Sequence, residues 1–417
     1  MLGHNPKNIV GADIVIRSSA VRDDNVEVLA AQAAGIPVLK REELLAQLTE
    51  ERQVIAVAGT HGKTTTTSML SWMFSLMGLD PSFLIGGISR NLSTNAHSGK
   101  GEFFIIEADE YDRMFLGLRP EIAVVTNIEH DHPDCFPTVS EYFQAFMHFA
   151  KRINKKGILV VCLDDPGSAR LFQEIELQGM KSITYGFGAS LYEAMPDYTA
   201  RDLILNDRGG FRFTLIKSDQ ALAEVSLLVP GEHNVRNALA ALSVADQLQL
   251  SLKEAVRSLA EFEGTGRRFE VRGEVAGIIV IDDYAHHPSE IRATLAGTKY
   301  RYPDHPVWAV WQPHTYSRTQ LLFDDFTQAF KDADHVLVTE VYGAREESGK
   351  SFSAKSIVDA MDHPDAKFIS EVREVTNYLR NRLKTGDVLI VLSAGDGIQI
   401  SEDIVKILSS KGSFMHA

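Results

Sequence analysis

A glycine-rich turn with residue types suited to phosphate binding comprises Gly59, Thr60, His61, Gly62, Lys63, Thr64 and Thr65. An apolar run at 54–58 predicts a strand before the turn, and residues 64–77 predict an amphipathic helix after it. Backbone N–H groups at the start of a helix, together with the positive end of its dipole, attract a phosphate chain. Lys63 can reach the outer phosphates of a nucleotide, and the hydroxyl of Thr64 can bind Mg²⁺.

This turn departs from the usual P-loop spacing. The motif has a glycine five residues before Gly62, where this chain has Val57. We therefore interpret the segment as a shortened variant. The alternative is an ordinary strand–helix turn with a surface lysine, but the strand before the turn and the helix closed by Gly78 favour a phosphate site.

Three carboxylates, Glu107, Asp109 and Glu110, follow the apolar run at 103–106. Ligands of parallel sheets bind beyond the carboxyl ends of the strands, which is also the edge predicted for the glycine turn. A carboxylate at this edge is a hard oxygen ligand suited to the Mg²⁺ that accompanies ATP. Glu107 is the preferred candidate because it comes first after the strand. A polar strand end that faces solvent is the alternative.

Residues 126–134 form a second polar segment, which includes Asn127, His130 and His132. A zinc site built from the two histidines lacks further ligands at the usual spacing. A second Mg²⁺ held by one histidine, with the neighbouring side chains positioning a substrate, agrees better with the pattern. Two cations would screen an attacking carboxylate from the phosphates. A capped surface loop is the alternative.

Asn234 and Asn237 lie near the start of an alanine-rich helix. Residues three apart share a helical face, so the two amides could match the donors and acceptors of a purine. Asparagines near a helix start are more often caps.

Farther along the chain, three polar segments each follow an apolar run: 281–288, 312–319 and 393–397. Together they indicate a binding rim, although any single one could be a structural turn.

The composition limits the classes of protein to which this chain can belong. The chain has 417 residues, a formal net charge of −14 and two cysteines, Cys135 and Cys162. The length is sufficient for two or three domains. The negative charge argues against nucleic-acid and anionic-membrane partners, and two cysteines are too few for a disulfide framework. No membrane-spanning run or secretory leader is recognisable, so we expect a cytoplasmic enzyme.

Strand and helix patterns alternate along the chain and predict an α/β protein. Residues 1–48, with strands expected at 13–16 and 36–39, resemble part of an α/β unit. A hairpin is expected over 198–217 at a sheet edge. Residues 263–268 are the candidate hinge between the later units. The expected buried strands of the central unit are 54–58, 103–106, 122–126 and 158–162. The C-terminal unit is expected to contain strands at 278–281, 307–311, 336–339 and 388–392, with helices at 288–299, 317–331, 354–361, 371–383 and 398–409.

The motifs at 59–65, 107–110, 127–132, 233–237 and 283–288 occur in this order, and with them the chain resembles the Mur ligases over essentially its whole length. The resemblance implies a partial Rossmann-like N-terminal domain that binds the UDP substrate (1–48), a P-loop-type central ATP-binding domain with a mostly parallel sheet (49–266), and a Rossmann-like C-terminal α/β domain that binds the amino acid and closes over ATP (267–417). Segments 266–269 and 312–319 favour the members that join L-alanine to UDP-N-acetylmuramate. The expected state is a monomer or weak homodimer.

The resemblance also implies roles for individual residues. ATP would be bound by residues 59–65, by Asn234 and Asn237 at the adenine and by Asp283 at the ribose. Thr64 and Glu107 would hold the first Mg²⁺, and His132 the second. Catalysis would use Lys63, with Arg268 leaning on the γ-phosphate and His286 as a base. The acceptor and muramate end would involve Asn127, His130, His287 and Arg318.

Three features depart from the family pattern. Members begin with a strand and a glycine-rich turn that grips the UDP diphosphate, so we expect roughly 45 to 50 residues to be absent before Met1. Tyr111 follows the acidic cluster where the alanine-adding members commonly carry a serine. Thr315 stands where many members have an arginine, which would leave Arg318 as the anchor of the incoming carboxylate.

Two other functions stay open at this point. Tyr111 is shared with the ligases that recycle murein tripeptide onto UDP-N-acetylmuramate. A non-catalytic protein in which ATP sets the angle between domains is the alternative from a different class, and the polar rims on both large α/β units argue against it.

Overall fold

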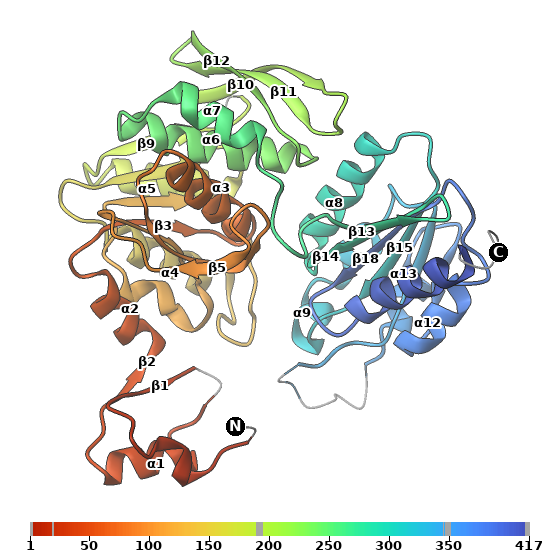
Figure 1. Cartoon of the computed structure of the whole chain (residues 1–417), viewed down its shortest axis with the longest axis horizontal. Coiled ribbons are helices and arrows are strands. Elements are labelled where there is room, and N and C mark those ends of the chain that lie inside the picture. Colours follow the sequence, from red (N-terminus) through yellow and green to blue (C-terminus); the bar gives the residue numbers. More distant parts are fainter. Residues whose placement is uncertain (1–2, 19–20, 189–194, 345, 347–351, 413–417) are drawn as a thin grey trace.

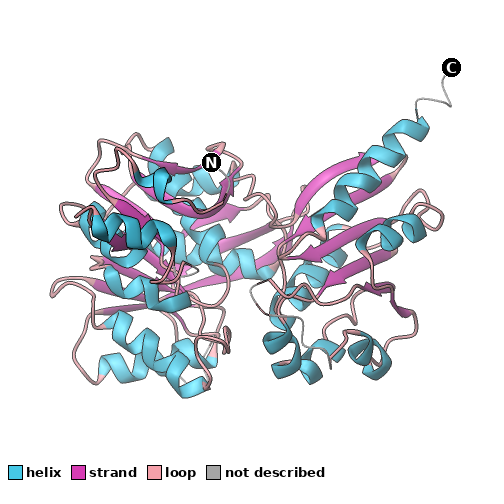
Figure 2. Ribbon diagram, turned by 90° about the horizontal axis from the view of Figure 1, so that it is seen from below, coloured by secondary structure: helices cyan, strands magenta, loops and turns pink. Residues whose placement is uncertain are grey.

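The computed structural model describes residues 3–18, 21–188, 195–344, 346 and 352–412. They form three α/β domains, each built on its own sheet, and in Figure 1 the N-terminal domain lies below the central one and the C-terminal domain to its right. The two larger sheets have helices packed on their faces (Figure 2). No helix in this part of the chain is both long and apolar enough to cross a lipid bilayer.

The N-terminal sheet consists of two short parallel strands, in which Val15 pairs with Val38. Asn25 caps α1 (Val26–Ala33) by accepting a hydrogen bond from the backbone N–H of Glu27, as expected of an asparagine before an apolar periodic run. The strands predicted at 13–16 and 36–39 lie one or two residues from the observed ones. The elements are η1 (Pro6–Ile9), β1 (Val15–Arg17), α1 (Val26–Ala33), β2 (Val38–Lys40) and α2 (Arg41–Thr49).

The central sheet has ten strands in the order β12-β11-β10-β9-β8-β7-β3-β6-β4-β5. Its middle is parallel, and antiparallel pairs occur only among the described strands at its two ends. The strands are β3 (Gln53–Ala58), β4 (Ser82–Ser89), β5 (Thr94–His97), β6 (Phe103–Glu107), β7 (Ile122–Val125), β8 (Ile158–Cys162), β9 (Ser182–Tyr185), β10 (Tyr198–Leu205), β11 (Phe211–Lys217) and β12 (Gln220–Ser226). The helices are α3 (Lys63–Leu76), η2 (Tyr111–Gly117), α4 (Val139–Ala150), α5 (Pro166–Glu176), α6 (Glu232–Gln247) and α7 (Leu252–Ala260).

Side chains along β3 alternate between the two faces of the central sheet, and both faces are buried. Ile55 and Val57 belong to the core under α3 and α6, whereas Val54 and Ala56 belong to the core under α4 and α5. The apolar run is continuous because β3 contributes side chains to a core on each face of the sheet. The hairpin predicted over 198–217 is confirmed as β10 and β11, which pair antiparallel at the edge of the parallel region.

The C-terminal sheet has the order β13-β14-β18-β15-β16-β17 and is parallel except for β13. Its strands are β13 (Glu270–Val275), β14 (Ile278–Asp283), β15 (Val307–Gln312), β16 (His335–Val338), β17 (Ala366–Phe368) and β18 (Val388–Ser393). Its helices are α8 (Pro288–Arg301), α9 (Tyr316–Leu321), α10 (Phe323–Thr327), α11 (Lys355–Ala360), α12 (Val372–Leu379) and α13 (Ile398–Gly412). The single helix predicted over 317–331 is wrong, because the backbone leaves the helical region at Leu322 (φ −103°, ψ 25°) and separates α9 from α10.

The segment between the two large domains is attached to the central sheet. Gly266 donates its N–H to the carbonyl of Ile88 (2.8 Å), and Arg90 donates to the carbonyl of Gly264 (3.0 Å). After these bonds the backbone takes positive φ values at Arg267 and Phe269. The first half of the predicted hinge at 263–268 is thus bonded to the end of β4, and the change of chain direction follows it.

Replacing Gly59 by alanine should destabilise the protein more than replacing Gly78. Both residues have positive φ (136° and 73°), which strains an L side chain. A Cβ at Gly59 would lie 2.0 Å from the Thr126 hydroxyl oxygen, whereas nothing lies within 4 Å of one at Gly78. We expect the free energy of unfolding to fall by about 1–2 kcal/mol for G78A and by several kcal/mol for G59A. Urea unfolding of both variants measures this, and equal losses would contradict the role of the close contact.

Candidate active site

The glycine turn lies between β3 and α3, as its sequence predicts, and is held by the polar segment after β7. Thr60 donates its hydroxyl to the carbonyl of Glu129 (2.8 Å). Asn127 accepts from the N–H of His61 (2.8 Å) and donates to its carbonyl (3.1 Å). Asn127, predicted to position a substrate, therefore fixes the backbone of the turn in this structure.

Lys63 is directed toward the carboxylates that follow β6. Its Nζ lies 2.9 and 2.8 Å from the two carboxylate oxygens of Glu110 and donates to the carbonyl of Gly59 (2.5 Å). The side chain of Glu110 is completely buried. Burial opposes ionisation of Glu110, but the charges of Lys63 and His132 outweigh it and lower the pKa of the carboxyl.

The residues predicted to hold the first Mg²⁺ are adjacent. The hydroxyl of Thr64 lies 3.1 Å from Oε1 of Glu107, and Glu107 also accepts from the backbone of Gly86 (2.6 Å). A Cβ at Gly86 would lie 2.5 Å from both carboxylate oxygens, so only glycine leaves room for them. Hard oxygen atoms in this arrangement are compatible with Mg²⁺.

His132, the predicted ligand of the second Mg²⁺, lies beside Glu110, with Nε2 3.6 Å from a carboxylate oxygen. Its φ of 54° is unusual for a residue with a side chain. His130 is directed elsewhere and bonds through Nε2 to the carbonyl of Phe136 (2.8 Å), within its own loop. The two histidines that suggested a zinc site thus have different partners.

Asn234 and Asn237 line an interdomain cleft of about 750 Å³, together with Arg268 and Asp283. Asn237 donates to the side-chain oxygen of Asn234 (3.1 Å), and a Cβ at Gly62 would lie 2.7 Å from Oδ1 of Asn237. The start of α6 is therefore packed directly against the glycine turn. The two asparagines share one face, as their spacing predicts.

The C-terminal domain contributes Arg268 and Asp283 to the same cleft. The guanidinium of Arg268 lies 3.3 Å from Glu290, and its central carbon lies 5.1 Å from the ring centre of Tyr284. Asp283 accepts hydrogen bonds from the backbones of Phe269 and Ala285 (both 2.7 Å). Burial nevertheless raises the pKa of Asp283 to about 6, against the opposing charge of Arg268.

His286 and His287 are both neutral, since burial lowers their pKa values to about 3 and about 4. Nδ1 of His286 lies 2.9 Å from the carbonyl of Tyr284, which can only accept, so Nδ1 carries the proton and Nε2 the lone pair. His287 caps α8 by accepting, at Nδ1, a long bond from the N–H of Ser289 (3.4 Å). Its Nε2 is buried and has no hydrogen-bond partner among the described residues.

Arg318 joins the two domains. Its Nε donates to Asp131 (2.6 Å), and both side chains are only 4% exposed. Its NH2 group lies 3.5 Å from Nδ1 of His132. A buried pair of this kind leaves an uncompensated charge when either member is removed. The predicted anchor of the incoming carboxylate is thus bonded to a carboxylate of the protein itself.

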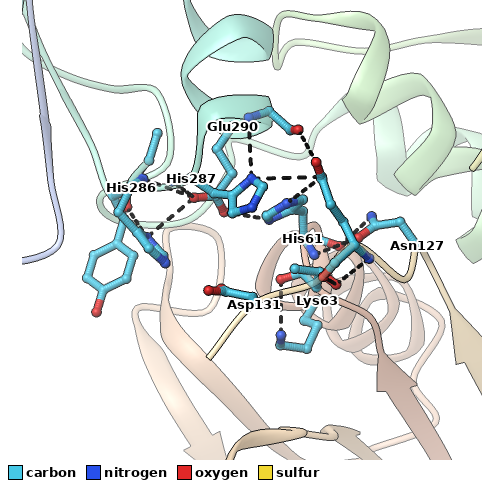
Figure 3. A network of polar contacts seen from close by, with 12 residues as sticks. His61, Lys63, Asn127, Asp131, His286, His287 and Glu290 are labelled. Atoms are coloured by element: carbon cyan, nitrogen blue, oxygen red, sulfur yellow. Dashed lines mark hydrogen bonds and ion pairs between the residues drawn. The ribbon is translucent and has the colours of Figure 1, made fainter. Parts of the chain in front are cut away.

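His61 forms a second link between the domains, as Figure 3 shows. Its Nε2 lies 3.1 Å from Glu129, and its Nδ1 lies 3.2 Å from Glu290 of α8. Burial disfavours the charged ring, but the charges of Glu290 and Glu129 outweigh this effect and raise the pKa of His61 to about 9. At neutral pH, His61 is therefore a cation between two carboxylates.

Four carboxylates are central in the structure: Glu110, Glu129, Asp131 and Glu290. Of these, the sequence offers only Glu110 as a candidate ligand, after Glu107. Glu129 and Asp131 lie inside a recognised motif, on either side of His130. Glu290 follows His287 by three residues and accepts from its N–H (3.3 Å), a spacing typical of a helix capping box. That pattern could have identified it. Nothing in the sequence indicates that Glu129 meets the other domain.

Family models match the chain in succession. Residues 1–53 match the model described as Mur ligase family, catalytic domain; residues 57–245 match the Mur ligase middle domain; and residues 267–395 match the Mur ligase, glutamate ligase domain. The matched ranges together span most of the chain and include every site residue described above.

Individual relatives carry a more specific name. The chain is 42% identical over 409 residues to the UDP-N-acetylmuramate–L-alanine ligase of Desulfosudis oleivorans, across 97% of this chain and 87% of the relative. It is 41% identical over 411 residues to the enzyme of the same name from Myxococcus xanthus, across 97% and 84%. The solved UDP-N-acetylmuramate–alanine ligase of Thermotoga maritima has a TM-score of 0.82 and 28% identity, covering 98% of this chain and 88% of that one.

Raising the pH should weaken the contact between the central and C-terminal domains. The pKa of His61 is raised from 6.5 to about 9, so its stabilising effect is fully present below pH 6.5 and is lost as the pH rises through about 9. Small-angle X-ray scattering between pH 7 and 10 should show opening with a midpoint near pH 9. The neutral variant H61N should lack this transition, and the same opening in H61N would refute the assignment.

Proposed function

The chain belongs to the Mur ligase family, and we propose that it uses ATP to join L-alanine to the carboxylate of UDP-N-acetylmuramate in the synthesis of peptidoglycan precursors. The single observation that supports this most is the shared edge of β3, β6 and β7. There the glycine turn, Lys63 and the carboxylates meet opposite the polar rim of the C-terminal domain. ATP and a UDP-linked precursor as substrates agree with the cytoplasmic location expected from the sequence.

The reaction has two steps. A carboxylate oxygen of UDP-N-acetylmuramate attacks the γ-phosphorus of ATP; an O–P bond forms, the bond to the β-phosphate oxygen breaks, and ADP leaves with its electron pair. The amine of L-alanine then attacks the carbonyl carbon of the acyl phosphate. Collapse of the tetrahedral adduct breaks the C–O bond to phosphate, which leaves with the electron pair, and the nitrogen gives its proton to the departing phosphate or to water as the amide forms.

Cationic side chains would stabilise the charge that spreads over the transferred phosphoryl group. Lys63 is already held at the turn, and its ammonium can exchange Glu110 for a phosphate oxygen without leaving the loop carbonyls. Arg268 lines the same cleft from the other domain. The backbone N–H groups of the turn and the start of α3 would bind the remaining phosphate oxygens.

Mg²⁺ fits the oxygen atoms present, with Thr64 and Glu107 as ligands of a first ion and His132 as a ligand of a second. When bound, these ions supply positive charge that neutralises the phosphates and the attacking carboxylate. Glu110 lies 2.8 Å from Lys63 and 3.6 Å from His132. It therefore balances the charge of Lys63 beside the proposed second cation site.

Asn234, Asn237 and Asp283 would bind the nucleoside. Their positions in the cleft support this assignment. Arg318 would bind the carboxylate of L-alanine by exchanging its bond to Asp131 for one to the substrate.

His286 would accept a hydrogen bond from the amine at its lone-pair nitrogen, Nε2. A ring with a pKa of about 3 is a weak base, so His286 would orient the amine more effectively than it would deprotonate an ammonium group. His130 and His287 remain candidates for contacts at the muramate end.

The murein tripeptide-recycling ligases are the second candidate function. A murein peptide ligase from Psychrobacter arcticus has the same identity, 28%, and the same coverage of 98% and 88% as the Thermotoga maritima enzyme, but a lower TM-score of 0.68. The hydroxyl of Tyr111, the residue that suggested this alternative, donates to Asp134 (2.9 Å), and its ring lies against His132. Tyr111 therefore lies next to the predicted second cation site.

An assay of ADP release with each acceptor discriminates between the two functions. We expect UDP-N-acetylmuramate with L-alanine to support turnover, and UDP-N-acetylmuramate with L-alanyl-γ-D-glutamyl-meso-diaminopimelate to give at least about 10²-fold lower kcat/KM, since an acceptor that lacks its contacts loses several kcal/mol. Omitting either acceptor or UDP-N-acetylmuramate should reduce ADP to background. ATP hydrolysis that needs neither substrate would contradict a ligase.

Replacing Lys63 by methionine keeps the length of the side chain and removes its charge. We expect kcat to fall by about 10²- to 10³-fold, the usual cost of removing one transition-state contact. Lys367, whose ammonium pairs with Asp365 at the surface, provides the control K367M, which should keep full activity. Circular dichroism checks that K63M is folded, and a folded K63M with normal kcat would refute the role of the turn.

A further inference from the structure

Three potential ligand side chains meet at the contact between the domains: His61, Glu129 and His287. We call them the interdomain cluster. His61 comes from the glycine turn, Glu129 from the loop after β7 and His287 from the N-terminal cap of α8. One ligand atom from each lies within 4.8 Å of the others. Figure 3 shows His61 and His287 facing each other across the contact, with Glu290 beside them.

Two distances within the interdomain cluster are close to those of tetrahedral coordination. Nε2 of His61 lies 3.1 Å and Nδ1 of His287 lies 3.8 Å from the same oxygen of Glu129, Oε2. Zinc binds nitrogen and oxygen at about 2.0–2.2 Å, which places neighbouring tetrahedral ligands about 3.3–3.6 Å apart. Small rotations of these side chains therefore suffice to bind one ion.

Neighbouring groups orient two of the ligands. Nδ1 of His61 lies 3.2 Å from Oε1 of Glu290, and histidine ligands commonly donate their second N–H to a carboxylate in this way. The hydroxyl of Ser289 donates to Oε1 of Glu129 (2.6 Å), which leaves Oε2 for the ion. Such outer contacts are typical of metal sites.

Charge also favours a cation at this place. Glu129 and Glu290 lie on either side of His61, and their two negative charges are balanced here by a proton on His61. His287 is neutral, and its Nδ1 lone pair accepts from backbone N–H groups at the start of α8, including a long bond from Ser289 (3.4 Å). An ion would replace the Nε2 proton of His61 and these capping bonds.

We propose that the interdomain cluster binds one divalent cation of the zinc class and thereby links the central and C-terminal domains. Two imidazole nitrogens and a carboxylate suit Zn²⁺, whereas Mg²⁺ requires oxygen ligands in an octahedron. His61, Glu129 and Ser289 line the interdomain cleft, so the fourth position is open to water or to an anionic oxygen. The ion would stabilise the closed arrangement, because its ligands come from both domains.

Titration of the full chain with Zn²⁺ alone tests this site. Calorimetry without nucleotide or substrate should show one ion bound per chain, with release of a proton from His61. The variants H61N, E129Q and H287N should bind at least about 10-fold more weakly. Asparagine at position 287 still caps a helix, so H287N is expected to fold. The exposed His97 provides the control H97A, which should bind as the wild type does.

Anomalous diffraction at the zinc edge should locate the ion between the three side chains. Wild-type affinity in all three variants would overturn the proposal, as would an ion found only at Thr64, Glu107 or His132. Absence of zinc binding would also overturn the proposal, and His61 would then link the domains only through ion pairs that require its proton. The experiment does not use the ligase reaction, so its failure and that of the proposed function are distinguishable.

Discussion

The buried ion pair of Lys63 and Glu110 is the interaction on which the rest of the site depends. Glu110 has no exposure to solvent, so its charge is tolerable only because Lys63, His132 and the hydroxyl of Tyr142 surround it. This requirement places the start of α3 beside the end of β6, and the loop after β7 beside both. The glycine turn, the carboxylates and the histidine thus occupy one edge of the sheet because a single charge has to be balanced.

At the contact between the domains, buried charges are again balanced by groups of opposite charge, and here the partners come from separate domains. Asp131 and Arg318 are both nearly excluded from water, and His61 lies between Glu129 and Glu290. The pairs of Arg318 with Asp131 and of His61 with Glu290 form only while the carboxyl ends of the two sheets face each other. The charges proposed to bind substrates are therefore also charges that hold the cleft in this arrangement.

The sequence predicts local features of this structure well and long-range contacts poorly. The strand, turn and helix at 53–76 and the hairpin of β10 and β11 were predicted because glycine placement and apolar alternation determine them within a few residues. Glu107 was preferred over Glu110 because it comes first along the chain, yet the contact of Glu110 with Lys63 depends on the pairing of β3 with β6. The roles of Glu129 and Glu290 depend on how two domains meet, which no local pattern encodes. The break at Leu322 was missed because the periodicity continues through it.

The attachment of residues 264–266 to the end of β4 has a consequence for motion. When one domain rotates about a hinge, a residue close to the hinge moves a short distance, whereas a residue far from it moves a long distance. Arg268 follows Gly266 by two residues, whereas Arg318 lies in α9 after β15, which is separated from β13 in the sheet by β14 and β18. Rotation about this attachment would therefore move Arg268, the proposed γ-phosphate partner, by a small distance and Arg318, the proposed amino-acid anchor, by a larger one. Such a lever would allow a nucleotide to bind in an open arrangement of the domains and the acceptor only in the closed one.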